Sequence, residues 1–498
     1  MKLSLLPALL AASLLSAASA FPVKPAPPSA EALRAARRAF DERVATRAQL
    51  VARAQPTEFI SKEPNYSLFN AFYENGTLPE PIRGSTGASS IGPSNPELDR
   101  QNPDSLAPPT TDGGNVPQTK WPFALSHNRL ESGGWARQQN VNNLPVATEI
   151  AGVNMRLEEG AFRELHWHST AEWAYVLNGS IRIATTDFEG RTYVNDVGPG
   201  DLWYFPSALP HSIQALSKGG AEFLLVFADG SFDENDTLLL SDFVAHIPRE
   251  VLLKNFGNAL NNSALDTFPK NELYIFNAPT PNTTASEDVS EIADPQGTTP
   301  SPYTFNLSGI APTKLPGGSI KIVDSRNFTV STQIAAAEVT IQPGAIRELH
   351  WHPNAEWDFF ISGHARITVF AGNANAATFD FQAGDTAYIQ QVNGHYIEAL
   401  GDEPVKYLEV FRAPVYQDVS LSTWLAVTPI NVVQAHLGLS RADALALQRA
   451  YRLNTHQLTG VSSSNSSATG TNGKRSLPEE DEAASARSRV VAGKRSWA

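Results

Sequence analysis

Residues 160–173 read GAFRELHWHSTAEW, and residues 344–357 read GAIRELHWHPNAEW. Eleven of these fourteen positions are identical, at an offset of 184 residues. The same offset aligns further pairs downstream: Gly179 with Gly363, Gly200-Asp201 with Gly384-Asp385, and His211 with His395. The chain therefore contains two copies of one domain, and each copy carries two histidines, a glutamate and a distant third histidine in the same order.

The composition limits the possible functions. At about 150 residues per domain, 498 residues suggest two or three domains, and the repeat favours two. A net charge of −13 without any long basic run argues against a nucleic-acid partner. The chain has no cysteine, which excludes disulfides, thiol nucleophiles and thiolate metal ligands.

The first 20 residues have the pattern of a secretory signal peptide. Lys2 precedes the apolar run LSLLPALLAASLL, and Ala18-Ser19-Ala20 fits a cleavage site. We therefore expect a secreted, extracellular protein. No other apolar stretch is long enough to cross a bilayer, so no membrane partner is expected. Some of the nine Asn-x-Ser/Thr sequons are expected to carry glycans; they begin at Asn65, Asn75, Asn178, Asn235, Asn261, Asn282, Asn306, Asn327 and Asn465.

Shifts in composition predict the domain layout after the signal peptide at 1–20. The expected segments are an N-terminal propeptide or arm at 21–80, a first domain at 81–264, a linker at 265–305, a second domain at 306–455 and a disordered tail at 456–498.

Within the two domains, many short strands between turns predict an all-β sandwich or barrel in each copy. Asn178-Gly179 is the strongest hairpin signal in the chain. Helical segments near 237–256 and 418–452 occupy equivalent places after the last strand of each copy. The prediction is therefore two β domains in tandem with flanking helices.

The repeated histidines and glutamate predict a metal site in each copy. Alternate side chains of a strand share one face, so His166 and His168 are expected to point the same way, toward Glu172 and His211. The second set consists of His350, His352, Glu356 and His395. Three imidazoles and one carboxylate suit Mn(II) or Fe(II), and also zinc, copper or nickel, so the ligands alone do not identify the metal.

The metal motif and its surroundings resemble the bicupins and, more closely, the secreted, fungal-type oxalate decarboxylases. The resemblance covers about residues 80–455 and includes PIRGSTGASSIGPSNPELDRQNPDSLAPP, SHNRLESGGWAR and GHYIEALGDEP. It implies two cupin jelly-roll barrels, two Mn(II) ions per chain, and conversion of oxalate to formate and carbon dioxide with dioxygen as co-catalyst. It leaves a homo-oligomer open.

The resemblance also implies roles for two arginines. Arg163 precedes His166 by three residues, and Arg347 precedes His350 by three. This odd spacing points each arginine away from the ligand face of a straight strand, so we expect a bulge or turn at Gly160-Ala161 to redirect the first one. In the family this arginine binds oxalate; the alternative is a structural ion pair with the following glutamate.

The segment SFDENDT, residues 231–237, resembles the family's mobile lid over the first metal. Glu234 matches the glutamate that donates the proton, and Asn235 and Thr237 match as well. Asp233 and Asp236 depart from the family pattern, which puts identical closure of the loop in doubt. An ordinary acidic surface loop is the alternative interpretation.

Three further residues match positions near the metals. Glu409 interrupts an apolar strand and is either a second acid or a structural glutamate bonded to Tyr416; the structural role is preferred. Trp203 matches an aromatic residue beside the first metal, where it either moves electrons or packs.

Three alternative functions remain. An oxalate oxidase would share every ligand, and Glu234 argues for decarboxylation instead. Arg163 and the polar lid argue against a bicupin dioxygenase acting on flavonols. A non-enzymatic, metal-retaining bicupin is disfavoured by two intact ligand sets.

Overall fold

The computed structural model describes residues 101–106, 108–257, 259–260, 262–292, 296–450 and 458–460. The predicted signal peptide, the N-terminal arm and almost all of the tail lie outside the described residues. Within the described ranges, no helix is long and apolar enough to cross a membrane.

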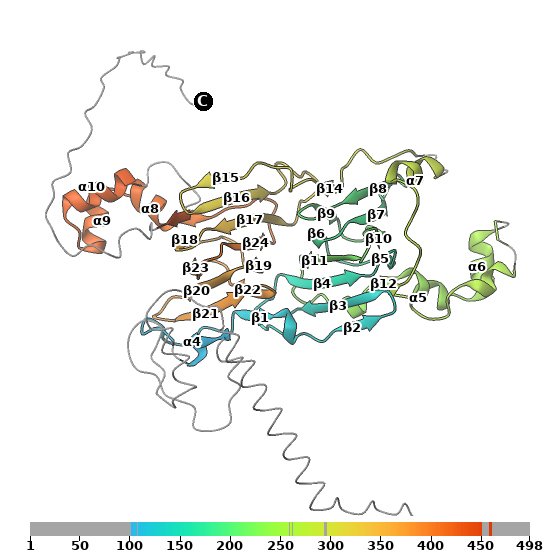
Figure 1. The fold of residues 1–498 in the computed structure, drawn as a ribbon, viewed down its shortest axis with the longest axis horizontal. Coiled ribbons are helices and arrows are strands. Elements are labelled where there is room, and N and C mark those ends of the chain that lie inside the picture. The colour runs from blue at the N-terminus through green and yellow to red at the C-terminus, as the bar shows by residue number, and fades with distance from the viewer. Residues whose placement is uncertain are drawn as a thin grey trace, which may run out of the picture. The chain divides into compact units, whose positions relative to one another are not determined.

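The first copy of the repeat folds into two antiparallel sheets (Figure 1). Its seven-stranded sheet consists, in order, of β14 (Thr304–Phe305), β9 (Leu202–Phe205), β6 (Glu172–Asn178), β11 (Ala221–Phe227), β4 (Ala151–Leu157), β3 (Gly134–Gln139) and β2 (Arg129–Glu131). Its six-stranded sheet consists of β12 (Leu238–Leu239), β5 (Phe162–Trp167), β10 (His211–Ala215), β7 (Ile181–Thr186) and β8 (Thr192–Val197), with β13 (Ile275–Phe276) paired to β5. Buried side chains of both sheets, such as Phe223 and Ile183, form one core.

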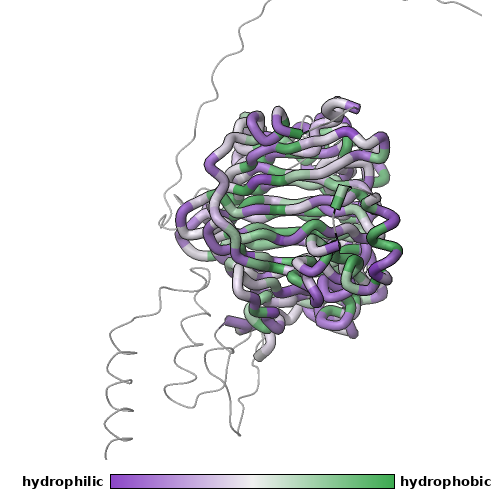
Figure 2. Tube along the Cα trace, turned by 90° about the vertical axis from the view of Figure 1, so that its right-hand side faces the viewer, coloured by the Kyte–Doolittle hydropathy of each residue, from purple (hydrophilic) through white to green (hydrophobic). Residues whose placement is uncertain are grey.

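The second copy repeats this architecture. Its seven-stranded sheet consists of β1 (Lys120–Pro122), β22 (Asp385–Ile389), β19 (Glu356–Ser362), β24 (Val405–Phe411), β17 (Ala335–Ile341), β16 (Gly318–Val323) and β15 (Thr313–Leu315). Its six-stranded sheet consists of β21 (Ala376–Gln382), β20 (His364–Phe370), β23 (Gly394–Leu400), β18 (Ala345–Trp351) and β25 (Val419–Ser420), with β26 (Leu458–Gly460) paired to β18. The predicted all-β pair of domains is confirmed. Figure 2 shows hydrophobic stretches along the stacked strands and hydrophilic stretches at many of the turns.

The two copies exchange edge strands. β1 precedes the first copy in sequence but pairs with β22 of the second copy. β14 follows the first copy's helices and returns to pair with β9. A shared hydrophobic cluster joins the two seven-stranded sheets through residues such as Trp173 and Leu224 from one copy and Trp357 and Leu408 from the other.

Helices follow the last strand of each copy, in the segments where they were predicted. They are α5 (Leu240–Ala245) and α6 (Arg249–Phe256) after the first copy, and α8 (Leu421–Val427), α9 (Ile430–Leu437) and α10 (Arg441–Ala450) after the second. The shorter helices described are α4 (Pro103–Leu106), η1 (Phe123–Leu125), η2 (Glu234–Asp236), η3 (Ala264–Thr267) and α7 (Ala285–Glu291). The segment 265–305 thus contributes β13, α7 and β14 as well as connecting the domains.

The hairpin predicted at Asn178-Gly179 is wrong. β6, which ends at Asn178, pairs with β9 and β11, whereas β7 pairs with β8 and β10 in the other sheet. Gly179 has φ of 77°, and a Cβ there would lie 2.4 Å from the carbonyl oxygen of Gly220. The glycine is therefore used for a tight corner between the sheets rather than for a hairpin.

Candidate metal centres

The first centre lies between two strands of the six-stranded sheet and the start of β6. His166 near the end of β5 pairs across the sheet with His211 at the start of β10. His168 follows β5, and Glu172 begins β6. All four side chains are buried, and one ligand atom from each lies within 4.8 Å of the others. The structure therefore brings together every residue of the predicted first ligand set.

Backbone carbonyls fix the orientation of the three imidazoles. Nδ1 of His166, His168 and His211 each donates a hydrogen bond to a carbonyl oxygen, of Glu164 at 2.6 Å, Thr170 at 2.7 Å and Leu209 at 2.8 Å respectively. These bonds leave each Nε2 unprotonated and directed at the centre. Nε2 of His211 has no hydrogen-bond partner among the described residues, as expected of a nitrogen reserved for a metal ion.

The electrostatics also favour a cation. Burial, reinforced by the charge of Arg163, lowers the pKa of His166 well below its usual range, and burial lowers that of His211. Burial opposes ionisation of Glu172, but His211 and His168 outweigh it and lower its pKa strongly. Neutral imidazoles beside an ionised carboxylate form the protonation state that binds a divalent metal.

The second centre repeats this geometry. Nδ1 of His350, His352 and His395 donates to the carbonyl oxygens of Glu348, Gln417 and Asn393 at 2.6, 2.8 and 3.0 Å. Oε2 of Glu356 lies 3.1 Å from Nε2 of His352 and 2.8 Å from Nε2 of His395. These four buried residues also offer ligand atoms within 4.8 Å of one another. The protein thus has two His₃Glu metal-binding sites.

Both arginines point inward because of a bulge that the sequence placed wrongly. On β5, Arg163 pairs with Ile213 and His166 with His211, so three steps on β5 match two steps on β10. The extra residue lies between Arg163 and His166 and not at Gly160-Ala161, where it was expected. It shifts the face of the strand and buries the Arg163 side chain completely.

The lid, residues 231–237, brings Glu234 to this arginine. Oε1 of Glu234 accepts hydrogen bonds from Nε of Arg163 at 2.9 Å and from the hydroxyl of Tyr274 at 3.2 Å, and it lies 2.8 Å from Nη2 of Arg163. The guanidinium also lies over the ring of Tyr274, 4.3 Å from its centroid. A buried carboxyl group, a buried guanidinium and a metal site therefore share one small space.

The comparisons with known proteins agree with this geometry. The sequence pattern of the cupin family matches residues 125–263 and 305–444. The chain is 52% identical over 375 residues to oxalate decarboxylase OxdC of Bacillus subtilis (strain 168), spanning 75% of this chain and 96% of that protein. A probable oxalate decarboxylase of Arthroderma benhamiae is 42% identical over 373 residues, spanning 74% and 90%.

The chain belongs to the bicupin oxalate decarboxylase family. A structure of the Bacillus subtilis oxalate decarboxylase, studied for its Mn(II) centers, superposes with a TM-score of 0.73 at 49% identity, covering 77% of this chain and 100% of that one. The predicted family and its two cupin domains are confirmed.

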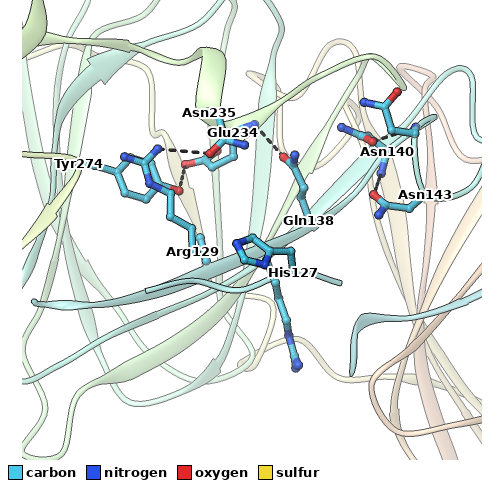
Figure 3. A pocket seen from close by; sticks show the side chains of 11 residues that line it. His127, Arg129, Gln138, Asn140, Asn143, Glu234, Asn235 and Tyr274 are labelled. Atoms are coloured by element: carbon cyan, nitrogen blue, oxygen red, sulfur yellow. Dashed lines mark hydrogen bonds between the residues drawn. The ribbon is translucent and has the colours of Figure 1, made fainter. Parts of the chain in front are cut away.

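The other predicted residues of this bicupin lie close to the centres, with different contacts. Nε1 of Trp203 donates to Oε1 of Glu172 at 2.7 Å, so the indole holds a metal ligand in place. Thr237 donates from Oγ1 to the carbonyl oxygen of Glu234 at 2.9 Å. Asn235 is exposed, and its Oδ1 accepts a long 3.4 Å bond from Arg129 (Figure 3).

Arg347 of the second cupin domain is surrounded by acidic partners. Its Nε lies 3.6 Å from Oε1 of Glu409, its Nη2 donates to the hydroxyl of Tyr416 at 3.2 Å, and Asp418 also accepts from it. Glu409 accepts from the hydroxyls of Tyr407 at 2.6 Å and Tyr416 at 2.5 Å. These contacts favour the structural interpretation of Glu409.

Sequence reasoning missed Tyr274 and Asp418. Tyr274 comes from the segment taken as a linker, so nothing local connected it with the site. A signal for Asp418 was present in the repeat: Ser241 and Ser422 both bond the glutamate that follows the arginine, but they are 181 residues apart rather than 184. The first copy therefore has three extra residues in the lid, and the shorter loop of the second copy supplies Asp418 instead.

Proposed function

We propose that this protein decarboxylates oxalate to formate and carbon dioxide at its first metal centre, with Mn(II) in both centres and dioxygen as co-catalyst. The observation that carries the proposal is the pairing of Arg163 with Glu234 beside a His₃Glu site, which gives one anion-binding group and one acid in the same space. The identity to the Bacillus subtilis and Arthroderma proteins supports oxalate as the substrate. The Mn(II) centers of the similar solved structure support manganese.

Manganese bound by the His₃Glu set would supply Lewis acidity and one-electron redox chemistry. The four protein ligands of a six-coordinate ion leave two positions for substrate and dioxygen. His166, His168, Glu172 and His211 would hold this ion, and Trp203 would keep Glu172 oriented through its hydrogen bond.

Arg163 binds the substrate in this proposal. Oxalate is a small dianion, and a guanidinium offers a permanent charge and a planar pair of donors to one carboxylate. Nη1 of Arg163 is buried and has no hydrogen-bond partner among the described residues, so it is available to a bound carboxylate.

Glu234 transfers the proton. When the C–C bond of hydrogen oxalate breaks, one carbon leaves as carbon dioxide and the other must gain a hydrogen to become formate. The proton lost by the substrate therefore has to return to carbon, which requires an acid within hydrogen-bond reach. Glu234 is buried beside Arg163, and Tyr274 holds its carboxyl group in place.

A combined assay on purified protein tests the proposal. We expect two manganese ions per chain by elemental analysis, and formate in near-equal amount to the oxalate consumed. Peroxide in that amount would identify an oxalate oxidase instead. A protein that binds both metals but leaves oxalate intact would contradict the proposal entirely.

We also propose secretion, because the signal-peptide pattern at residues 1–20 is followed by a chain without cysteine but with nine sequons. Mass spectrometry of protein from culture medium should find a new N-terminus near residue 21 and glycans at some sequons. Light scattering on the same sample tests for the homo-oligomer.

A further inference from the structure

The lid is attached to β3 through one side-chain amide. Nε2 of Gln138 donates to Oδ1 of Asp233 at 2.9 Å, and Oε1 of Gln138 accepts from the backbone N–H of Glu234 at 2.8 Å. Figure 3 shows Gln138 directed from its strand toward the turn that carries Glu234. The same amide thus contacts the acid of the proposed reaction and the residue before it.

A second amide supports the start of the lid. Nδ2 of Asn140 donates to the carbonyl oxygen of Phe232 at 3.0 Å, and the N–H of Val141 donates to the carbonyl oxygen of Gly230 at 2.9 Å. These two bonds fix the approach of the loop. They do not reach Glu234, so Gln138 is the group from β3 that sets the direction of the turn.

Asp233 connects this contact to the turn itself. Its Oδ1 accepts from the backbone N–H of Asn235 at 2.9 Å and from the side-chain amide of Asn235 at 2.8 Å, so it caps the η2 turn that contains Glu234. Burial opposes ionisation of Asp233, but the hydrogen bonds from Gln138 and Asn235 outweigh it and lower its pKa. Asp233 is therefore an acceptor with no proton to donate.

Of the side chains of this length, only an amide satisfies both partners. The Asp233 carboxylate needs a donor, and the Glu234 N–H needs an acceptor. A glutamate would face Asp233 with a second negative charge, and a leucine would leave both groups unbonded. The sequence departure at Asp233 is thus matched by an amide on the neighbouring strand.

We infer that Gln138 is a positioning residue that holds the Glu234 turn in place over the first metal centre through Asp233. The inference rests on the proposed function, because the reaction measures the position of Glu234. Gln138 does not touch the substrate. Its loss is expected to lower proton delivery while metal binding and the fold persist.

Two single variants test this. Gln138→Leu should lower kcat for formate by roughly tenfold to a hundredfold, part of the ~10²–10⁴ that general acid catalysis contributes. The KM for oxalate should change less, because Arg163 is untouched, and formate produced per oxalate consumed should fall. Gln138→Glu should fall at least as far above pH 5, where two carboxylates repel each other.

A swapped pair gives the decisive arm. In Gln138→Glu with Asp233→Asn, the carboxylate and the amide exchange places. The introduced carboxylate on β3 accepts from the backbone N–H of Glu234, and the introduced amide on the lid donates to that carboxylate. Formate yield should return to within about threefold of wild type, in a cycle that is far from additive. If the swap does no better than Gln138→Glu alone, the Gln138–Asp233 contact does not position the lid.

Gln139→Leu is the matched control. Gln139 lies next on β3, and its Oε1 accepts from Nε1 of Trp357 in the core between the two copies at 2.7 Å. This variant should lower Tm but leave the formate yield per oxalate unchanged. A Gln138→Leu protein with wild-type kcat and yield would overturn the inference. Wild-type protein that makes no formate would overturn the proposed function instead.

Discussion

The two metal centres have the same four ligands but differ in the partners of the neighbouring arginine. Arg163 has Glu234 from the lid and the ring of Tyr274, whereas Arg347 has Glu409 from the middle of β24, Asp418 and Tyr416. Two acids held by the second copy's fold occupy Arg347. The single acid on Arg163 belongs to a three-residue turn, so this centre is the better suited to admit a substrate anion.

A second difference concerns the support of the ligand glutamate. In the first copy Trp203 pairs across the sheet with Ala174, and in the second Ala387 pairs with Asp358. The large partner has moved from one strand to its neighbour. Burial, with the nearby charges of Glu356 and Glu409, raises the pKa of Asp358 well above its usual range. An indole supports the glutamate in one centre, and a buried acid lies beside it in the other.

The largest expected effect separates the centres by metal loss. His168→Ala should leave about one metal ion per chain and abolish formate production, because the proposed reaction centre is empty. His352→Ala should lose a similar amount of metal yet keep measurable activity. Both variants should have lower Tm, since a metal that binds only the folded state stabilises it. Elemental analysis and formate assays decide this, and equal activity loss in both would remove the functional distinction.

The next effect compares the two acids. Glu234→Ala should lower formate production by about 10²–10⁴-fold with both metals retained, because it removes the general acid. The matched change, Asp418→Ala, should alter it by less than about tenfold, since Arg347 keeps Glu409. Peroxide is measured alongside, as a diverted reaction would release it. Unchanged formate in Glu234→Ala would assign the proton to another acid, with Glu409 the first candidate.

Metal-free protein should become less stable as the pH falls from 7 to 5. The folded-state pKa values of His166, His211 and His350 lie below the unfolded value of about 6.5, so the unfolded chain takes up protons that the folded chain does not. Each such histidine contributes about 1–2 kcal/mol of lost stability over this range. Burial acts to lower the pKa of His352, but Glu356 raises it, which gives the opposite sign.

Denaturation of chelated protein at several pH values measures this difference. His166→Gln should flatten the decline, and His352→Gln should steepen it. Identical slopes in the two variants would show that the centres do not differ in proton uptake.

The smallest effect concerns a glycan. Nδ2 of Asn235 donates to Asp233 within the lid, and a sugar there would add bulk to a loop that must exclude water. We expect Asn235 to be unmodified in active enzyme and the exposed Asn282 to be a better acceptor. Glycopeptide mapping of both sites tests this. A mostly occupied Asn235 would mean that the loop does not close and that Glu234 is not the acid.

The sequence predicted what depends on local spacing. The His₃Glu sets lie in short, repeated motifs, so strand periodicity was enough to place His166 and His168 together. It failed where one residue changes the geometry: the bulge after Arg163 reverses the face of the strand, and Gly179 makes a corner that looks like a hairpin in sequence. Tyr274 and Asp418 could not be placed, because long-range packing brings them to the arginines.

The exchange of β1 and β14 has a consequence for how this protein can be divided. Cutting the chain between the copies would leave each half carrying the other's edge strand and missing its own. The exposed backbone of β22 or β9 would then be open to pairing with other molecules. The two domains should accordingly unfold in one transition, and expression of either alone should give aggregates unless the missing strand is appended by circular permutation.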